Sequence, residues 1–88
     1  MMVGAMTVRV LLFARARDLA GTDTLTLETP AGLTLRQLRE ELARRFPALA
    51  DFLPRCQLAI HDTLADDCAL VPEEATVAVL PPVSGGTI

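Results

Sequence analysis

Runs rich in β-branched and aliphatic residues recur along the chain, and several alternate polar and apolar positions, which is the period of a half-buried strand. These patterns predict strands at residues 7–13, 24–28, 57–61, 69–71 and 76–80. Between the first two, residues 14–20 are expected to form a short helical turn that Gly21 closes. The two strands are therefore expected to form a wide antiparallel hairpin. Residues 62–67 have the composition of a turn.

The clearest predicted helix follows this hairpin. Thr34 and Gln37 have the spacing of a capping box, in which each side chain satisfies a free backbone N–H group of the other residue. The apolar residues that share the inner face of this helix are Leu35, Leu38, Leu42 and Phe46. Pro47 ends the helix, and a second short turn at residues 49–53 is expected to pack under the sheet.

The order of these elements predicts the fold class. Two strands, a helix and then further strands are typical of the α+β layout of a β-grasp (ubiquitin-like) domain, with a mixed sheet of four to five strands and one main helix packed on one face. The domain is expected to cover residues 6–81, and residues 82–88 to form an extended C-terminal tail with a diglycine. Residues 1–5 are expected to be a disordered leader, which makes Met6 a candidate alternative start.

The alternation also predicts an asymmetry between the two faces of the sheet. The residues that it places on the outer face of the first and last strands include Leu11, Phe13, Ala78 and Leu80, whereas the second strand has Thr and Glu there. In a β-grasp sheet the first and last strands are neighbours, so these apolar side chains would form one exposed patch. Such a patch usually marks a surface for a partner protein. Alternatively, the short turns after Phe13 or around Leu64 fold over it.

Composition limits the possible functions. The chain has 88 residues, 51% of them hydrophobic, which suffices for one core but leaves little chain for a deep cleft. It has one His, no Tyr, no Trp and no nucleophile motif, so an active site of its own is not expected. All basic residues are arginines and the formal net charge is −3. Glu40 and Glu41 lie among the arginines at positions 36, 39, 44 and 45 on an expected solvated face. Nucleic acid is therefore not an expected partner.

Location and metal binding follow from the same residues. The chain has no signal-peptide pattern and no stretch as long as a membrane span, so a cytoplasmic location without a membrane partner is expected. There Cys56 and Cys68 are expected to be small, mostly buried thiols rather than a disulfide. Together with His61 they match no zinc spacing, and no metal site is expected.

The C-terminal segment has an unusual composition. Pro81 and Pro82 stiffen the exit from the last strand, because each ring fixes φ and removes a hydrogen-bond donor. Gly85 and Gly86 have no Cβ atom, so this part of the chain fits a channel too narrow for other residues. From Pro82 to Gly86 an extended chain reaches roughly 15–18 Å. Directly after a strand, this combination favours delivery of a C-terminus into another protein; otherwise it is an ordinary frayed terminus.

Two segments of the chain resemble a known family. Residues 6–21 (MTVRVLLFARARDLAG) and 81–86 (PPVSGG) are similar to the two ends of the small subunits of molybdopterin synthase. Residues 34–38 and the Thr63-Leu64 turn are also similar, so that the resemblance covers residues 6–86. Its most specific part is the Pro-Pro-Val-Ser-Gly-Gly run.

The resemblance implies a sulfur carrier that binds no cofactor itself. An adenylating enzyme of the ubiquitin-activating type would use ATP to activate the carboxylate of Gly86, and sulfur would then replace the adenylate to give a thiocarboxylate. A large subunit, expected in a heterotetramer, would transfer this sulfur to cyclic pyranopterin monophosphate. Gly85 would give clearance for the tail. The residues that would face partner proteins are Phe13, Arg17, Leu64, Leu80, Pro82 and Val83.

The chain departs from this family after its second glycine. The family ends there, whereas here Gly86 is followed by Thr87-Ile88, so its carbonyl belongs to an amide that cannot be adenylated. Removal of these two residues by a tail-trimming protease is the preferred interpretation. The alternatives are a sulfur carrier for thiamine, cysteine or tRNA thiolation, and a non-catalytic ubiquitin-like binding module with an unprocessed tail. The sulfur donor stays open.

Overall fold

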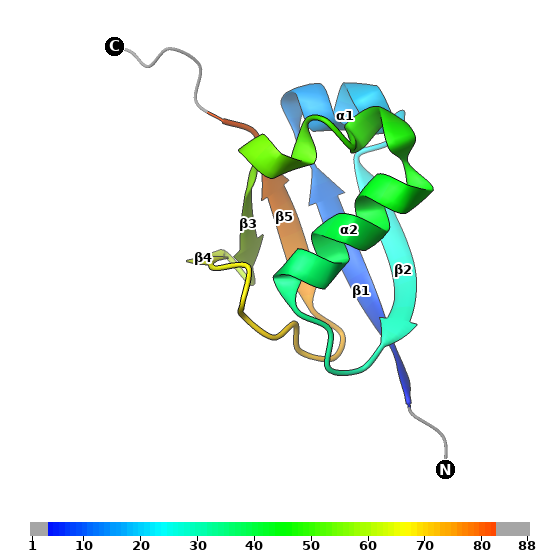
Figure 1. Ribbon diagram of the computed structural model, residues 1–88, viewed down its shortest axis with the longest axis vertical. Coiled ribbons are helices and arrows are strands. Elements are labelled where there is room, and N and C mark those ends of the chain that lie inside the picture. The colour runs from blue at the N-terminus through cyan, green and yellow to red at the C-terminus, as the bar shows by residue number, and fades with distance from the viewer. Residues whose placement is uncertain (1–3, 83–88) are drawn as a thin grey trace.

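The computed structural model describes residues 4–82. Five strands form one mixed sheet in the order β2-β1-β5-β3-β4, and the long helix α2 crosses one of its faces (Figure 1). The elements are β1 (Ala5–Leu12), α1 (Ala14–Ala20), β2 (Thr24–Pro30), α2 (Leu35–Arg45), the 3-10 turns η1 (Pro47–Leu49) and η2 (Leu53–Arg55), β3 (Gln57–Ile60), β4 (Thr63–Ala65) and β5 (Thr76–Leu80). This arrangement confirms the predicted α+β layout with one main helix, and α1 is the predicted short helical turn of residues 14–20.

The predicted hairpin is the first part of the sheet. Strands β1 and β2 pair antiparallel over seven residue pairs, from Ala5–Pro30 to Leu11–Thr24. Helix α1 lies between them and ends at Gly21, whose φ of 78° is in the left-handed region that glycine adopts without strain. One expectation needs correction: the leader was expected to include Ala5, but this residue begins β1, because its backbone pairs with the end of β2.

The second half of the sheet differs from the prediction in one strand. Residues 62–67, expected to be a turn, contain β4, which pairs antiparallel with β3. His61 and Asp62 both have positive φ, at 49° and 70°, and form the two-residue turn between these strands. Residues 69–71, expected to be a strand, contribute only an isolated bridge between Leu70 and Thr34. Strand β5 lies between β1 and β3, parallel to the first and antiparallel to the second.

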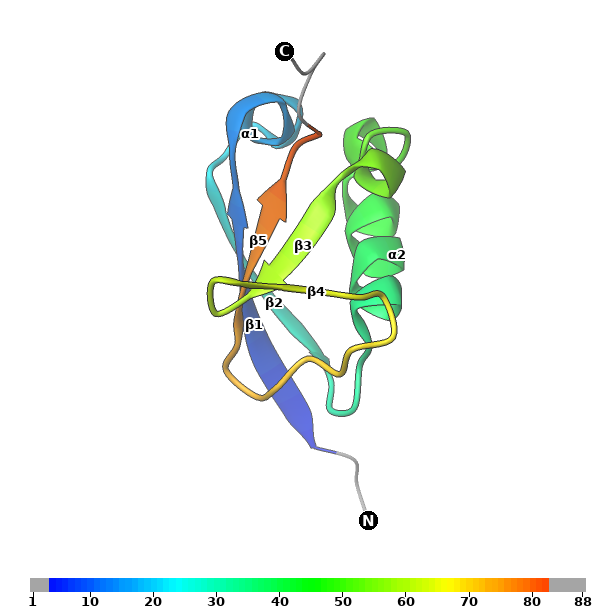
Figure 2. The same cartoon turned by 90° about the vertical axis from the view of Figure 1, so that its left-hand side faces the viewer.

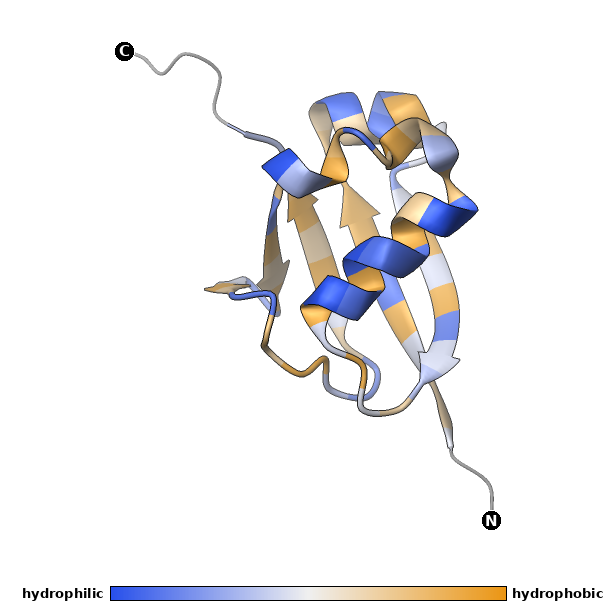
Figure 3. Cartoon of the chain, in the orientation of Figure 1, coloured by the Kyte–Doolittle hydropathy of each residue, from blue (hydrophilic) through white to orange (hydrophobic). Residues whose placement is uncertain are grey.

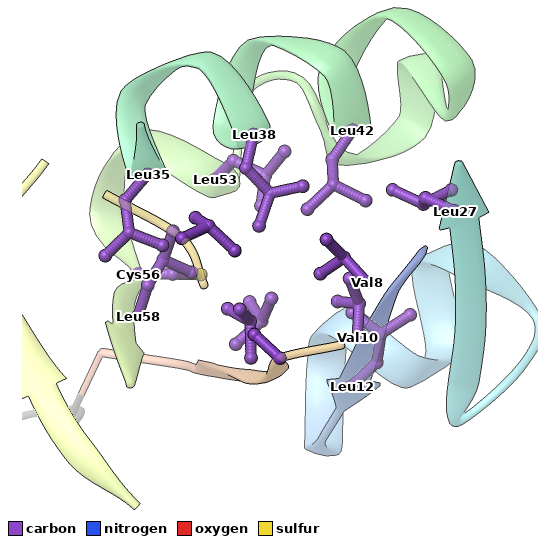
Figure 4. Packing of buried hydrophobic residues seen from close by; sticks show 14 of the residues in the cluster. Val8, Val10, Leu12, Leu27, Leu35, Leu38, Leu42, Leu53, Cys56 and Leu58 are labelled. Carbon is purple, nitrogen blue, oxygen red and sulfur yellow. The ribbon is translucent and has the colours of Figure 1, made fainter. Parts of the chain in front are cut away.

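The core lies between α2 and the inner face of the sheet. Figure 3 shows apolar residues on the side of α2 that meets the sheet and polar residues on its outer side, and Figure 4 shows the leucines of α2 pointing into the space between this helix and the sheet. Leu35, Leu38 and Leu42 of α2 and Val8 and Val10 of β1 are fully buried. The capping box is present, with Gln37 N donating to Thr34 Oγ1 at 3.2 Å and Thr34 N to Gln37 Oε1 at 2.9 Å. As expected, the turns after α2 are buried through Leu49 and Leu53.

One arginine of α2 is not part of the solvated face. The side chain of Arg39 is only 16% exposed and forms an ion pair with Asp67 at 2.8 Å. Its Nη1 also donates to the backbone carbonyls of Leu53 and Cys56. Arg39 therefore connects α2 to η2 and to the loop that follows β4. This corrects the sequence-based expectation that it is solvated.

Replacing Arg39 is expected to lower the free energy of unfolding. Arg39→Met keeps the apolar stem but leaves two carbonyls without their donor, which should cost about 2 kcal/mol. Arg36→Met is the control, because Arg36 is exposed on the same helix, and it should change stability by less than about 0.5 kcal/mol. Urea unfolding followed by circular dichroism measures both, and equal midpoints for the two variants would contradict the connecting role of Arg39.

Candidate functional site

Helix α2 lies on one side of the sheet, and we call the opposite side the open face (Figure 2). The strand register brings residues from four strands into one row across it. Leu11 is opposite Ala78, Ala78 is opposite Ala59, and Ala59 is opposite Leu64. Leu80 follows Ala78 on the same side of β5, and Phe13 directly follows β1. The open-face patch is defined here as Leu11, Phe13, Ala59, Leu64, Ala78 and Leu80.

The exposure of these residues shows which are available to a partner. Phe13 is 43% exposed and Leu64 is 57% exposed, whereas Leu11, Ala78 and Leu80 are half-buried. The alternative that the turn around Leu64 folds over the patch is wrong, because this segment is β4, which extends the sheet sideways. The predicted gathering of Leu11, Phe13, Ala78 and Leu80 is therefore confirmed, and Leu64 joins it.

The patch lies beside the exit of the C-terminal segment. Strand β5 runs parallel to β1, so the C-terminal ends of both strands lie at the same end of the sheet. There Phe13 follows β1 and Pro81 follows β5 (Figure 1). Pro81 is half-buried and Pro82 is exposed. The predicted site residues Val83, Gly85 and Gly86 lie outside the described residues. A partner that covers the patch would therefore contact the base of the tail as well.

Arg17 occupies a different place from the other candidate residues. It is exposed on α1, and its backbone carbonyl accepts a hydrogen bond from Gly21 N at 2.9 Å. A shallow hollow next to it is lined by Arg17, Asp18, Gly21, Thr22 and Asp23. The structure thus brings Phe13, Leu64 and Leu80 together on the open face and places Arg17 on the helix at the end of the sheet.

Sequence reasoning missed Ala59 as a member of the patch. Ala59 is only 4% exposed although no helix of residues 4–82 crosses this face, because it lies between Ala78 and Leu64. The sequence contains a signal for this position, because the alternation in residues 57–61 puts Gln57 and Ala59 on the same side of the strand. The position of Leu64 opposite Ala59 was not available, because β4 was not recognised as a strand.

The two cysteines differ in environment. Cys56 is 4% exposed, its Sγ donates to the carbonyl of Phe52 at 3.4 Å, and burial raises the pKa of its thiol. Cys68 is exposed, which corrects the expectation that both thiols are mostly buried. In residues 4–82 no three His, Cys, Asp or Glu side chains are grouped to hold a metal ion. None of the helices in this range is both long and apolar enough to cross a bilayer.

These features are those of a protein that acts by docking. An apolar patch beside a proline-stiffened exit, followed by Gly85 and Gly86, can place a glycine carboxylate into another protein once the bond between Gly86 and Thr87 is hydrolysed. The chemistry that such a group supports is acyl activation, in which the carboxylate gains a leaving group that a nucleophile displaces.

Comparisons with known proteins agree with this geometry. The model of the ThiS family matches residues 10–86. The molybdopterin synthase sulfur carrier subunit of Arabidopsis thaliana is 40% identical over 79 residues, which are 90% of this chain and 82% of the plant protein. The putative molybdopterin converting factor subunit 1 of Pyrococcus furiosus superposes with a TM-score of 0.81 at 28% identity, over 89% of this chain and 99% of that one. A chain in the complex of subunits 1 and 2 of the Helicobacter pylori molybdopterin-converting factor superposes with a TM-score of 0.66 at 26% identity. The match covers 92% of this chain and 100% of that one.

Proposed function

This chain belongs to the ThiS family, and we propose on that basis that it is the sulfur carrier subunit of a molybdopterin synthase. The observation that carries the proposal is the 40% identity to a protein of that name over 90% of the chain. The open-face patch beside the exit of the tail supports it, because a carrier needs a docking surface close to its reactive end. The proposed location is the cytoplasm, where the thiols of Cys56 and Cys68 stay reduced.

The proposed reaction takes place at the carboxylate of Gly86. An adenylating enzyme of the ubiquitin-activating type would join this carboxylate to the AMP part of ATP and release pyrophosphate. Sulfide would then form a bond to the carbonyl carbon while the C–O bond to AMP breaks, which gives the thiocarboxylate and releases AMP. A free carboxylate is a poor electrophile, and the mixed anhydride supplies the leaving group. The domain itself binds no cofactor in this scheme.

The proposed acceptor of the tail is the large subunit of the synthase. A related chain of the Helicobacter pylori factor is found in a complex of subunits 1 and 2, which supports a large-subunit partner for this chain. The open-face patch with Phe13, Leu64 and Leu80 would bind it, and Pro82 and Val83 would guide Gly85 and Gly86 into its active site. The sulfur would pass there to cyclic pyranopterin monophosphate, in a heterotetramer with two large subunits. Arg17, on the separate surface of α1, would contact a partner protein at the end of the sheet.

Processing of the tail is part of the proposal. The carbonyl of Gly86 forms a peptide bond with Thr87, and an amide offers no carboxylate to ATP. A protease must therefore hydrolyse this bond before activation. The bond between Gly86 and Thr87 also favours a second candidate function, a ubiquitin-like binding module whose tail stays uncleaved.

The intact mass of the protein purified from its own organism tests the proposal. We expect a chain that ends at Gly86, with one oxygen replaced by sulfur in part of the sample. Retention of Thr87 and Ile88 in every molecule, in cells that are producing the cofactor, would exclude the carrier and leave the binding module. Transfer of the sulfur to a product other than molybdopterin would instead identify a carrier for another pathway.

A further inference from the structure

We infer that Arg9 extends the docking surface on the open face and pairs with a carboxylate of the large subunit, an inference that rests on the proposed function. Arg9 is exposed and lies between Val8 and Val10, which are fully buried under α2, so its side chain lies on the open face. The register puts Arg9 opposite Thr26 on one side and Thr76 on the other. Its row is therefore the one next to Leu11 and Ala78 of the open-face patch.

The guanidinium of Arg9 has no partner of its own within residues 4–82. The ion pairs there are Arg39–Asp67, Arg44–Glu41 and Arg45–Glu41. Two acidic residues lie near Arg9, namely Glu28, which is opposite Thr7, and Glu74, but neither comes within ion-pair distance. Arg9, Glu74 and three threonines line a surface hollow of about 470 Å³ together with Ala75. The hollow borders the patch and offers room for a side chain of a partner.

The open-face patch is too small to form a whole protein–protein interface, so the interface must extend beyond it. A specific interface buries about 800 Å² on each partner, its apolar centre is surrounded by a polar rim, and arginine is enriched in interfaces relative to the rest of the surface. The open-face patch has six members, of which two are alanines. Only Phe13 and Leu64 are exposed, at 43% and 57%. A partner seated on them covers the next row of the sheet as well, and Arg9 lies in that row.

The chemistry of the guanidinium determines what the partner must present. Arg9 carries five N–H donors and no acceptor, and covering it removes the water that satisfies them. A carboxylate matches this group best, because it accepts two parallel hydrogen bonds and compensates the charge. The hydroxyls of Thr26 and Thr76 on either side can donate to the same carboxylate.

Binding of chains that end at Gly86 to the large subunit of the same organism tests this inference. Relative to the wild type, Arg9→Met should raise Kd about tenfold and Arg9→Glu at least about 100-fold. The dependence of Kd on salt should become weaker in Arg9→Met, since one charge pair is lost. Arg36→Glu is the matched control, because Arg36 is exposed on α2, which covers the opposite face of the sheet. The Kd of this variant should stay within about twofold of the wild-type value.

The outcomes separate this inference from the proposed function. Thermal unfolding identifies any variant that fails to fold, and Arg9→Lys, which keeps the charge but not the paired geometry, should bind with intermediate affinity. If Arg9→Glu and Arg9→Met both bind like the wild type, the role of Arg9 is refuted while the carrier function stands. If the wild type does not bind the large subunit at all, the proposed function fails, and the inference fails with it.

Discussion

A chain that ends at Gly86 is expected to be converted to a thiocarboxylate by its adenylating enzyme, whereas the chain that continues through Thr87 to Ile88 is expected to give no such product. The difference should be all-or-none, because the reacting carboxylate of Gly86 exists only after the bond to Thr87 is hydrolysed. A carboxylate on Ile88 is no substitute, since a β-branched side chain does not enter a channel shaped for glycine.

The experiment compares three chains of 88, 86 and 85 residues. Each is incubated with the adenylating enzyme, ATP and a sulfur donor, and the intact mass reports the exchange of oxygen for sulfur. The chain of 85 residues ends at Gly85 and keeps a glycine carboxylate, but its tail is shorter by about 3.5 Å. Because misplacement by about 1 Å can cost about 100-fold in rate, we expect the rate of thiocarboxylate formation on this chain to fall by at least that factor. A thiocarboxylate on the uncleaved chain would show that Gly86 is not the reactive residue.

Much of the fold was predictable because local patterns and tertiary packing agree. The alternation in residues 7–13 identified Val8 and Val10 as inward-facing, and both are fully buried. The capping box at Thr34 marked the start of α2. The open-face patch followed from the same alternation once β1 and β5 were taken as neighbours, which the sheet order confirms. Short-range signals thus determined where α2 begins and which side of β1 faces the core.

Strand β4 was missed because its turn carries no usual signal. A two-residue hairpin turn needs positive φ at both positions, and glycine or asparagine normally mark it. Here His61 and Asp62 adopt these angles, held by the pairing of β3 with β4. Residues 69–71 looked more like a strand, but their backbone groups bond to the segment that enters α2 instead of to the sheet. Leu35 N donates to the carbonyl of Ala69, and Val71 N donates to the carbonyl of Leu33. Tertiary pairing overrode local propensity in both segments.

The candidate site was only partly accessible to the same reasoning. The alternation located Phe13 and Leu80 on the outer face, but nothing in it assigns a reaction to Gly86, whose role rests on family resemblance. The partly buried position of Arg39 was also not predictable, because its partners Leu53, Cys56 and Asp67 are distant in sequence. Contacts across many residues depend on how the elements pack, and a periodic pattern does not contain that information.

Replacing Leu64 by aspartate is expected to weaken binding to the large subunit by at least about 30-fold, with little effect on the fold. Leu64 is 57% exposed and lies opposite Ala59 in the row that crosses the open face. A carboxylate there must lose its water when the partner covers it, and it also removes an apolar anchor, which at such positions costs about 2–4 kcal/mol. A cost of about 1.4 kcal/mol corresponds to a tenfold change in Kd.

Leu70 provides a matched control for this substitution. It is the same residue type and is 65% exposed, but it pairs with Thr34 at the start of α2 rather than with a residue of the patch. Both variants should unfold within about 0.5 kcal/mol of the wild type, since exposed substitutions rarely cost more. Isothermal titration with the large subunit should then separate them, with Leu70→Asp binding like the wild type. Equal losses in both would show that affinity follows overall charge rather than the open-face patch, and unchanged binding of Leu64→Asp would move the docking surface to another side of the domain.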